Sequence, residues 1–147
     1  MNVKLLNDKT LKILKDAGWY SGRKINYLAK MKKLEDEGYE SFEYAYRIME
    51  ELGELKIVGG PTIFFDAYYV GTGDYEYMED VEKIINECAF PIGEYYQKVI
   101  YVGISKKIYI RDCEDMYFVA NSIEEGLNLL CDTTFVPKLI GTIVYEE

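Results

Sequence analysis

The spacing of apolar residues divides the chain into a helical first third and a more β-rich remainder. Apolar residues recur at intervals of three and four up to residue 52, which predicts three amphipathic helices before any strand. The expected capping and stop residues of these helices are, in order, Asp8 with Gly18, Asn26 with Gly38, and Ser41 with Gly53. Beyond them the pattern changes to short β-rich runs at residues 55–58 and 62–69, which predict strands.

The rest of the chain mixes helical and strand patterns, and the apolar tail is expected to add a strand. The expected elements are an acidic helix capped by Asp74, a hairpin, a third strand, a helix opened by the capping box Ser122 to Glu125, and the tail, over residues 74–87, 99–104 with 107–111, 116–119, 122–131 and 135–145. This order predicts an α+β fold, with N-terminal helices followed by a mostly antiparallel sheet with flanking helices. We expect a single domain over residues 1–147, with the sheet partly open on one face.

A tight turn follows the first helix and contains the only tryptophan of the chain. Trp19 lies between Gly18 and Gly22, which suggests a large side chain set into the core by the turn. Arg23 is expected to brace the turn by stacking on the indole ring or by pairing with a carboxylate. A binding role for these residues is the alternative, and the structural role is favoured because single aromatic residues at helix junctions usually pack.

Two separated segments of the chain form short, distinctive sequence motifs. The first is Ala17-Gly18-Trp19-Tyr20-Ser21-Gly22-Arg23, and the second is Phe90-Pro91-Ile92-Gly93-Glu94, which leads into the hairpin. In this order they resemble the third subgroup of the SUKH immunity-protein superfamily, whose relatives include the yeast cell-wall-assembly regulator family. The resemblance covers residues 5–131 and implies structural roles for Gly18, Trp19, Gly22, Arg23, Pro91 and Gly93. It also implies a non-enzymatic protein that binds a bacterial polymorphic toxin.

Composition excludes several other classes of function. The chain has 147 residues and no histidine, which excludes Ser-His-Asp and Cys-His catalysis and His-ligated zinc. No apolar run is long enough for a membrane helix, and the first residues lack the apolar region of a secretory signal, so a cytosolic location is expected. The three cysteines, Cys88, Cys113 and Cys131, lack the spacing of metal or redox motifs and are expected to be small core residues.

Charge is distributed unevenly along the chain. The net charge is −9, yet residues 1–33 hold nine Lys or Arg against two Asp, a net +7, so the remainder holds −16. An acidic body repels nucleic acid and attracts basic proteins, which predicts a basic protein partner and neither a nucleic-acid nor a membrane partner. The basic stretch alone could contact phosphate, and on charge alone solvated helix faces of an acidic protein are the favoured interpretation. The sequence leaves the oligomeric state open.

Several small clusters could be mistaken for chemical sites. Gly71-Thr72-Gly73 lacks the lysine and spacing of a phosphate loop. Asp112, Glu114 and Asp115 lack the spacing of a calcium loop, so a solvated turn is the better interpretation. Glu94 with Asp112 could serve as a carboxylate pair for glycoside hydrolysis, but nothing in the sequence indicates the cleft that such chemistry needs. We therefore predict no catalytic, cofactor-binding or metal-ligating residue.

The fifteen tyrosines suggest a protein-binding surface. Many stand beside acids, and tyrosine provides rigid amphipathic contact area at interfaces. The residues predicted to bind the partner are Asp74, Tyr75, Glu76, Glu79, Asp80, Glu94, Tyr95 and Tyr96. Two functions remain open: an immunity protein that neutralises a basic toxin domain, such as a nuclease, or an interaction or regulatory module of the same fold without a toxin partner.

Overall fold

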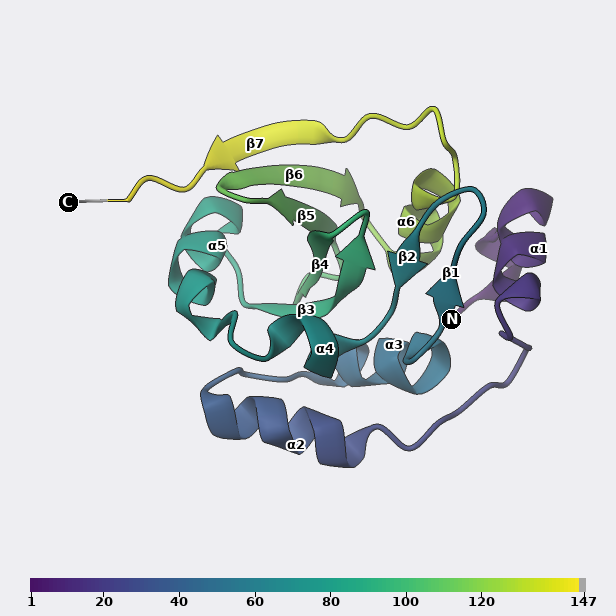
Figure 1. Cartoon of the computed structure of the whole chain (residues 1–147), viewed down its shortest axis with the longest axis horizontal. Helices are drawn as coiled ribbons and strands as arrows, with labels where there is room; N and C mark the ends of the chain where they lie inside the picture. The colour runs from purple at the N-terminus through teal and green to yellow at the C-terminus, as the bar shows by residue number, and fades with distance from the viewer. Residues whose placement is uncertain (146–147) are drawn as a thin grey trace.

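Helices and one sheet make up the structure, which is a computed structural model that describes residues 1–145 (Figure 1). The helices are η1 (Val3–Leu5), α1 (Asp8–Asp16), α2 (Leu28–Glu37), α3 (Glu43–Leu52), α4 (Ala67–Gly71), η2 (Tyr75–Tyr77), α5 (Met78–Ile85) and α6 (Ile123–Leu130). The strands are β1 (Lys56–Ile57), β2 (Ile63–Phe64), β3 (Ala89–Tyr95), β4 (Lys98–Gly103), β5 (Ile108–Asp112), β6 (Asp115–Ala120) and β7 (Lys138–Thr142). The predicted α+β class is confirmed, and residues 146 and 147 of the expected single domain lie outside the described residues.

The sheet is an antiparallel meander in which the strands lie side by side in chain order from β1 to β7. Because neighbouring strands run in opposite directions, the β1–β2, β3–β4 and β5–β6 turns gather at one end of the sheet. The β4–β5 turn lies at the other end. The predicted hairpin, the third strand and the added tail strand are all present.

The two faces of the sheet are covered by different helices. Gly126 of α6 lies against Ile108, whereas the hydroxyl of the next residue, Tyr109, donates to Glu87 just after α5 at 2.7 Å. Successive side chains of a strand point to opposite faces, so α5 and α6 cover opposite faces of the sheet. Figure 1 shows this arrangement, with α5 at the left and α6 with α1 at the right. We refer to the α5 face and the α6 face below.

Helix ends follow local hydrogen bonding, which corrects three predicted caps. The amide oxygen of Asn7, and not the Asp8 carboxylate, accepts from the Thr10 N–H at 2.8 Å and caps α1. The α3 helix begins at Glu43, because the Ser41 hydroxyl is hydrogen-bonded to Glu35 instead of capping it. Two further predictions are confirmed: α2 ends at Gly38, with a φ of 120°, and Ser122 caps α6. The start of α2 differs, because Tyr27 and not the expected Asn26 occupies its N-cap position and makes no side-chain cap bond.

The long strand expected at residues 62–69 is wrong beyond its first residues. β2 covers only Ile63–Phe64, and the chain then enters α4. The reason is Asp66, whose carboxylate accepts from the Tyr69 N–H at 3.2 Å and caps the short helix. The same carboxylate accepts from the buried Tyr27 hydroxyl, which ties α4 to the start of α2.

Only one of the three cysteines is a core residue. Cys131 is buried, and burial raises the pKa of its thiol to about 11. Cys88 and Cys113 are exposed, which corrects the expectation that all three fill the core. Cys113 has a positive φ of 54° in the β5–β6 turn, so turn geometry places it outside.

Candidate functional site

A buried arginine fixes the start of the acidic helix to the α5 face of the sheet. Arg111 on β5 donates to the Asp74 carboxylate at 2.7 Å, to the Tyr101 hydroxyl at 3.0 Å and to the Cys113 carbonyl at 2.9 Å. Its guanidinium lies 4.3 Å from the centre of the Tyr77 ring. One side chain therefore joins η2, two strands and the β5–β6 turn.

The expected capping role of Asp74 is wrong, because this carboxylate serves Arg111 instead. Burial raises the pKa of Asp74, and this effect outweighs the opposing attraction of Arg111 and the hydrogen bond from Tyr101. Asp74 is thus a positioning residue that is largely removed from solvent. It holds the exposed acids of η2 and α5 in place and is poorly suited to contact a partner itself.

The other end of α5 is fixed by a second carboxylate. Glu87 accepts from the Tyr109 hydroxyl and from both the N–H and the hydroxyl of Ser105 in the β4–β5 turn. Burial acts to raise the pKa of Glu87, but these hydrogen bonds outweigh it and the pKa is lowered. The helix therefore runs along the strands from one end of the sheet to the other.

This arrangement gathers acids at one end of the sheet. The η2–α5 start adjoins the β5–β6 turn through Arg111, and the β3–β4 turn lies at the same end. We call this region the acidic end, and its residues are Glu76, Glu79, Asp80, Glu94, Asp112, Glu114 and Asp115. Among the described residues it contains one close ion pair to a lysine, Glu79 with Lys83 at 3.2 Å. The acidic end therefore presents a negative field to solvent.

The strand register places Glu94 relative to Arg111 and its partner Asp74. Glu94 pairs with Val99, and Val99 pairs with Arg111, so the three side chains form one row on the α5 face. Neighbouring strands are about 4.8 Å apart, which places Glu94 about 10 Å from the arginine that holds Asp74. Glu94 is half-buried, and the structure brings it to the same face and the same end as the predicted acidic helix.

The predicted tyrosines are not gathered on the α5 face, although the rings of Tyr95 and Tyr96 pack edge-on against each other with centres 4.7 Å apart. Tyr75 packs edge-on against Tyr39, with ring centres 5.1 Å apart, on the side of α2. Tyr95 points to the α6 face, because it follows Glu94 in the strand. Tyr96 lies in the β3–β4 turn, where its hydroxyl donates to the Gly60 carbonyl at 2.8 Å. Tyr96 is 44% exposed and is the better placed of the last two for contact at the acidic end.

The residues with predicted structural roles lie in two places. Trp19 is only 3% exposed, in a turn where Gly18 and Gly22 have φ values of 106° and 86°. Within residues 1–145, Arg23 neither stacks on Trp19 nor pairs with a carboxylate within 4 Å; it donates to the carbonyls of Glu51 and Gly53 at 2.7 and 2.9 Å. It thereby satisfies carbonyl groups at the end of α3.

Pro91 and Gly93 lie on either side of a β-bulge in the middle of the sheet. A Cβ at Gly93 would lie 2.4 Å from the Phe64 carbonyl oxygen, so only glycine lets β2 approach β3 this closely. This is the local reason for the glycine in the Phe90–Glu94 segment.

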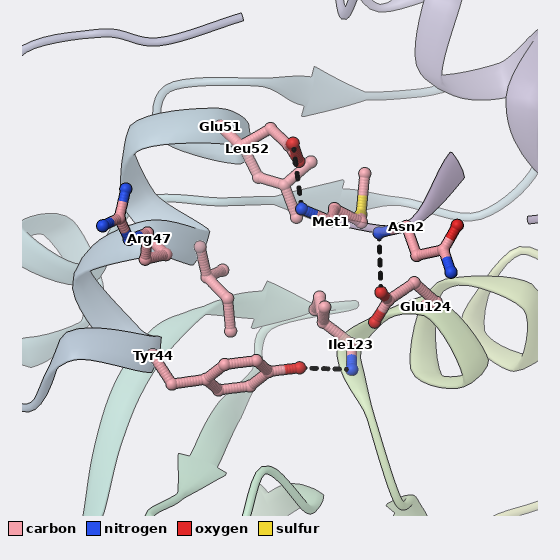
Figure 2. Close-up of a pocket in the computed structure, with 9 residues that line it drawn as sticks. Met1, Asn2, Tyr44, Arg47, Glu51, Leu52, Ile123 and Glu124 are labelled. Atoms are coloured by element: carbon pink, nitrogen blue, oxygen red, sulfur yellow. Dashed lines mark hydrogen bonds and ion pairs between the residues drawn. The ribbon is translucent and has the colours of Figure 1, made fainter. Parts of the chain in front are cut away.

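A small cavity of about 190 Å³ lies where the first residues meet α3 and α6 (Figure 2). Asn2 donates its N–H to Glu124 at 2.8 Å, and the Met1 ammonium pairs with Glu51 at 3.4 Å. The Tyr44 hydroxyl accepts from the Ile123 N–H at 3.0 Å. Figure 2 shows these polar groups directed at one another across the cavity wall, so they join three segments of the chain. No nucleophile is paired with a base among them.

Within residues 1–145, no group of three or more Cys, Asp or Glu side chains is arranged to hold a metal ion. Among the same residues, no helix is long and apolar enough to cross a membrane.

Comparison with known proteins decides the family. A family model described as SUKH-3 immunity protein matches residues 6–133. The chain belongs to the SUKH-3 immunity protein family. The expected membership is therefore confirmed, and with it toxin immunity as the general function of the family. Searches of curated proteins and of solved structures find no significant match.

Within this SUKH-3 chain, the residue that sequence reasoning missed is Arg111. A signal was present: it is a lone arginine in the apolar run Ile108-Tyr109-Ile110-Arg111, at a position that strand alternation turns to the same face as Tyr109. A buried charge needs a partner, so an arginine whose side chain points into the core is expected to pair with a carboxylate from elsewhere in the chain. The sequence does not show that this carboxylate is Asp74.

Proposed function

We propose that this SUKH-3 protein is a cytosolic, non-enzymatic inhibitor that neutralises one bacterial toxin domain by binding it. The observation that carries the proposal is the acidic end, where exposed carboxylates of the η2–α5 start and of the β5–β6 turn lie at one end of one sheet, with the half-buried Glu94 of β3 beside them. A field of one sign attracts a partner of the other sign and raises its association rate. The proposed partner is therefore a toxin domain with a basic surface, such as a nuclease whose active site binds phosphate.

The organisation of the acidic end supports binding over catalysis. The segment that carries its exposed carboxylates is held by the buried Arg111 at one end of α5 and by the half-buried Glu87 at the other, so the surface is ordered before a partner arrives. Order in the free state reduces the entropy that binding must remove. The described residues place no nucleophile–base pair beside these acids, so the arrangement favours recognition.

The test is inhibition of the toxin domain encoded beside this chain. Growth of cells that express the toxin domain should recover when this protein is co-expressed. With purified proteins, toxin activity should fall linearly and vanish at about one equivalent of inhibitor, because a binder is consumed by its target. Inhibition by far less than one equivalent would indicate an enzyme. An absence of inhibition together with an absence of binding would favour the interaction module without a toxin partner.

A further inference from the structure

The last strand leaves one edge of the sheet open next to the acidic end. Among the strands of residues 1–145, β7 pairs with β6 on one side and is outermost in the sheet, as Figure 1 shows along its upper border. An edge strand presents unpaired N–H and C=O groups that can pair with a further strand. The opposite edge is less suited, because β1 has only two residues and is followed by Gly59-Gly60-Pro61.

The register identifies which backbone groups of β7 are free. Thr142 pairs with Asp115, and the Ile143 N–H donates to the Glu114 carbonyl at 2.7 Å. In an antiparallel ladder this pattern makes Thr142 and Asp115 a non-hydrogen-bonded pair. The N–H and C=O of Thr142 therefore point away from β6 toward the open edge. The register therefore gives the Thr142 N–H no acceptor in β6.

The side chains around this edge combine apolar exposure with negative charge at the Thr142 end, whereas the exposed Lys138 lies at the other end of β7. Leu139 is 54% exposed, Val144 is 79% exposed and Tyr145 is 61% exposed. Beside them, the Asp115 carboxylate accepts from the Thr142 hydroxyl at 2.7 Å. The edge thus offers apolar contacts for alternate side chains of an added strand and a carboxylate at its Thr142 end.

We propose that β7 accepts an extended segment of the toxin domain as an eighth strand, with basic side chains of that segment next to Asp115 and Glu114. This proposal rests on the proposed function and adds the mode of recognition. In strand addition the backbone hydrogen bonds supply affinity, and the flanking side chains supply specificity. The acids at the Thr142 end supply the charge complementarity that a basic segment needs.

A second copy of this chain is a poorer occupant of the edge. Each copy has a net charge of −9, so two copies repel each other. A register shift opposite Met116 and Tyr117 places a bulge at Ile140, which interrupts the regular ladder that self-pairing would need. A basic segment meets neither the charge repulsion nor a second bulge.

Amide hydrogen exchange, measured by NMR on this protein with and without the toxin domain encoded beside it, tests the proposal. In the free protein the Thr142 amide should exchange faster than the Ile143 amide, which is already bonded to Glu114. In the complex, exchange at Thr142 should slow by at least about tenfold, because its N–H becomes part of a ladder. Ile143 is the internal control and should change little.

A matched pair of substitutions gives a second measurement. Thr142→Pro removes the outward N–H, whereas Thr142→Val keeps it and loses only the hydroxyl. The proline variant should raise the Kd at least about tenfold, and the valine variant should leave it nearly unchanged. Circular dichroism checks the fold of both. If the proline variant does not fold, the exchange measurement on the unsubstituted protein still decides.

The outcomes separate this proposal from the one on which it rests. If the toxin domain binds tightly through the carboxylates of the acidic end but the exchange rate of the Thr142 amide does not change, strand addition is wrong and the proposed function stands. No toxin binding at all would overturn both. If the Thr142 amide of the protein without toxin exchanges more slowly as the protein concentration rises, a second copy occupies the edge, and this result would also overturn the proposal.

Discussion

Replacing Arg111 with methionine removes the central anchor of the acidic end. The substitution keeps most of the aliphatic volume and deletes the guanidinium. The side chain of Arg111 is 8% exposed and that of its partner Asp74 is 15% exposed, so the carboxylate is left in a poorly solvated place without its counter-ion. The Tyr101 hydroxyl and the Cys113 carbonyl each lose a hydrogen bond as well.

The expected cost follows from these contacts. Removing one partner of a buried ion pair costs about 3 to 5 kcal/mol, because the remaining charge is uncompensated. We therefore expect Arg111→Met to lower the free energy of unfolding by about 3 to 5 kcal/mol at neutral pH. Adding Asp74→Asn removes the stranded charge and should restore about 1 to 3 kcal/mol of this loss. The deficit should also shrink at lower pH, since a protonated Asp74 needs no counter-ion.

Urea denaturation followed by circular dichroism measures these differences. The matched control is Arg47→Met, because Arg47 forms ion pairs at 3.0 and 3.7 Å but its side chain is 61% exposed. Exposed pairs contribute about 0 to 1 kcal/mol, so the control should shift the midpoint little. If Arg111→Met lowers the free energy of unfolding no more than the control does, Arg111 is not the anchor of the acidic end. If the double variant Arg111→Met, Asp74→Asn is less stable than Arg111→Met, the unpaired Asp74 carboxylate is not the cause of the loss.

Three further predictions concern the core, the pH dependence and the interface. Trp19→Ala should cost about 3 to 5 kcal/mol in urea denaturation, and Trp19→Phe less, because phenylalanine keeps a ring and removes an indole N–H that has no partner within residues 1–145. Because the pKa of Glu87 is lowered on folding, its contribution to stability is fully present above pH 4.5 and is lost as the pH falls through its folded pKa. The stability difference between wild type and Glu87→Gln should therefore shrink below pH 4.5, and a difference that grows there would contradict the pKa direction. Tyr96→Ala should mainly speed dissociation of the toxin domain, by a factor corresponding to about 1 to 3 kcal/mol, whereas an unchanged rate in surface plasmon resonance would place Tyr96 outside the interface.

Periodicity and turn residues were sufficient to predict the class and order of most elements. The helices before the sheet, the hairpin and the capping box at Ser122 depend on local patterns, and local patterns are visible in one sequence. The strand expected at residues 62–69 failed for a local reason as well. Aromatic and β-branched residues there favour a strand, but Asp66 can cap a helix, and this cap won.

The site was harder to predict because its geometry depends on contacts between distant segments. Asp74 has the position of a cap, and only the folded sheet shows that its carboxylate meets Arg111. Glu94 and Tyr95 were grouped as neighbours in sequence, yet strand alternation turns them to opposite faces. The gathering of acids at one end follows from the meander, which places alternate turns together. The sequence contained the residue types but not this arrangement.

Association kinetics with charge-reversed variants test the central claim most directly. The variant Glu76→Lys, Glu79→Lys, Asp80→Lys changes the acidic end, and the control Asp8→Lys, Asp16→Lys, Asp36→Lys makes the same change in net charge at exposed positions on α1 and α2. Both are compared with wild type in binding the toxin domain at low and high salt, with circular dichroism as the check on folding. We predict that the first variant associates about tenfold more slowly at low salt and loses most of its salt dependence, while the control changes far less. Equal slowing by both variants would show that only net charge matters, and unchanged rates for the first variant would contradict a toxin-binding acidic end.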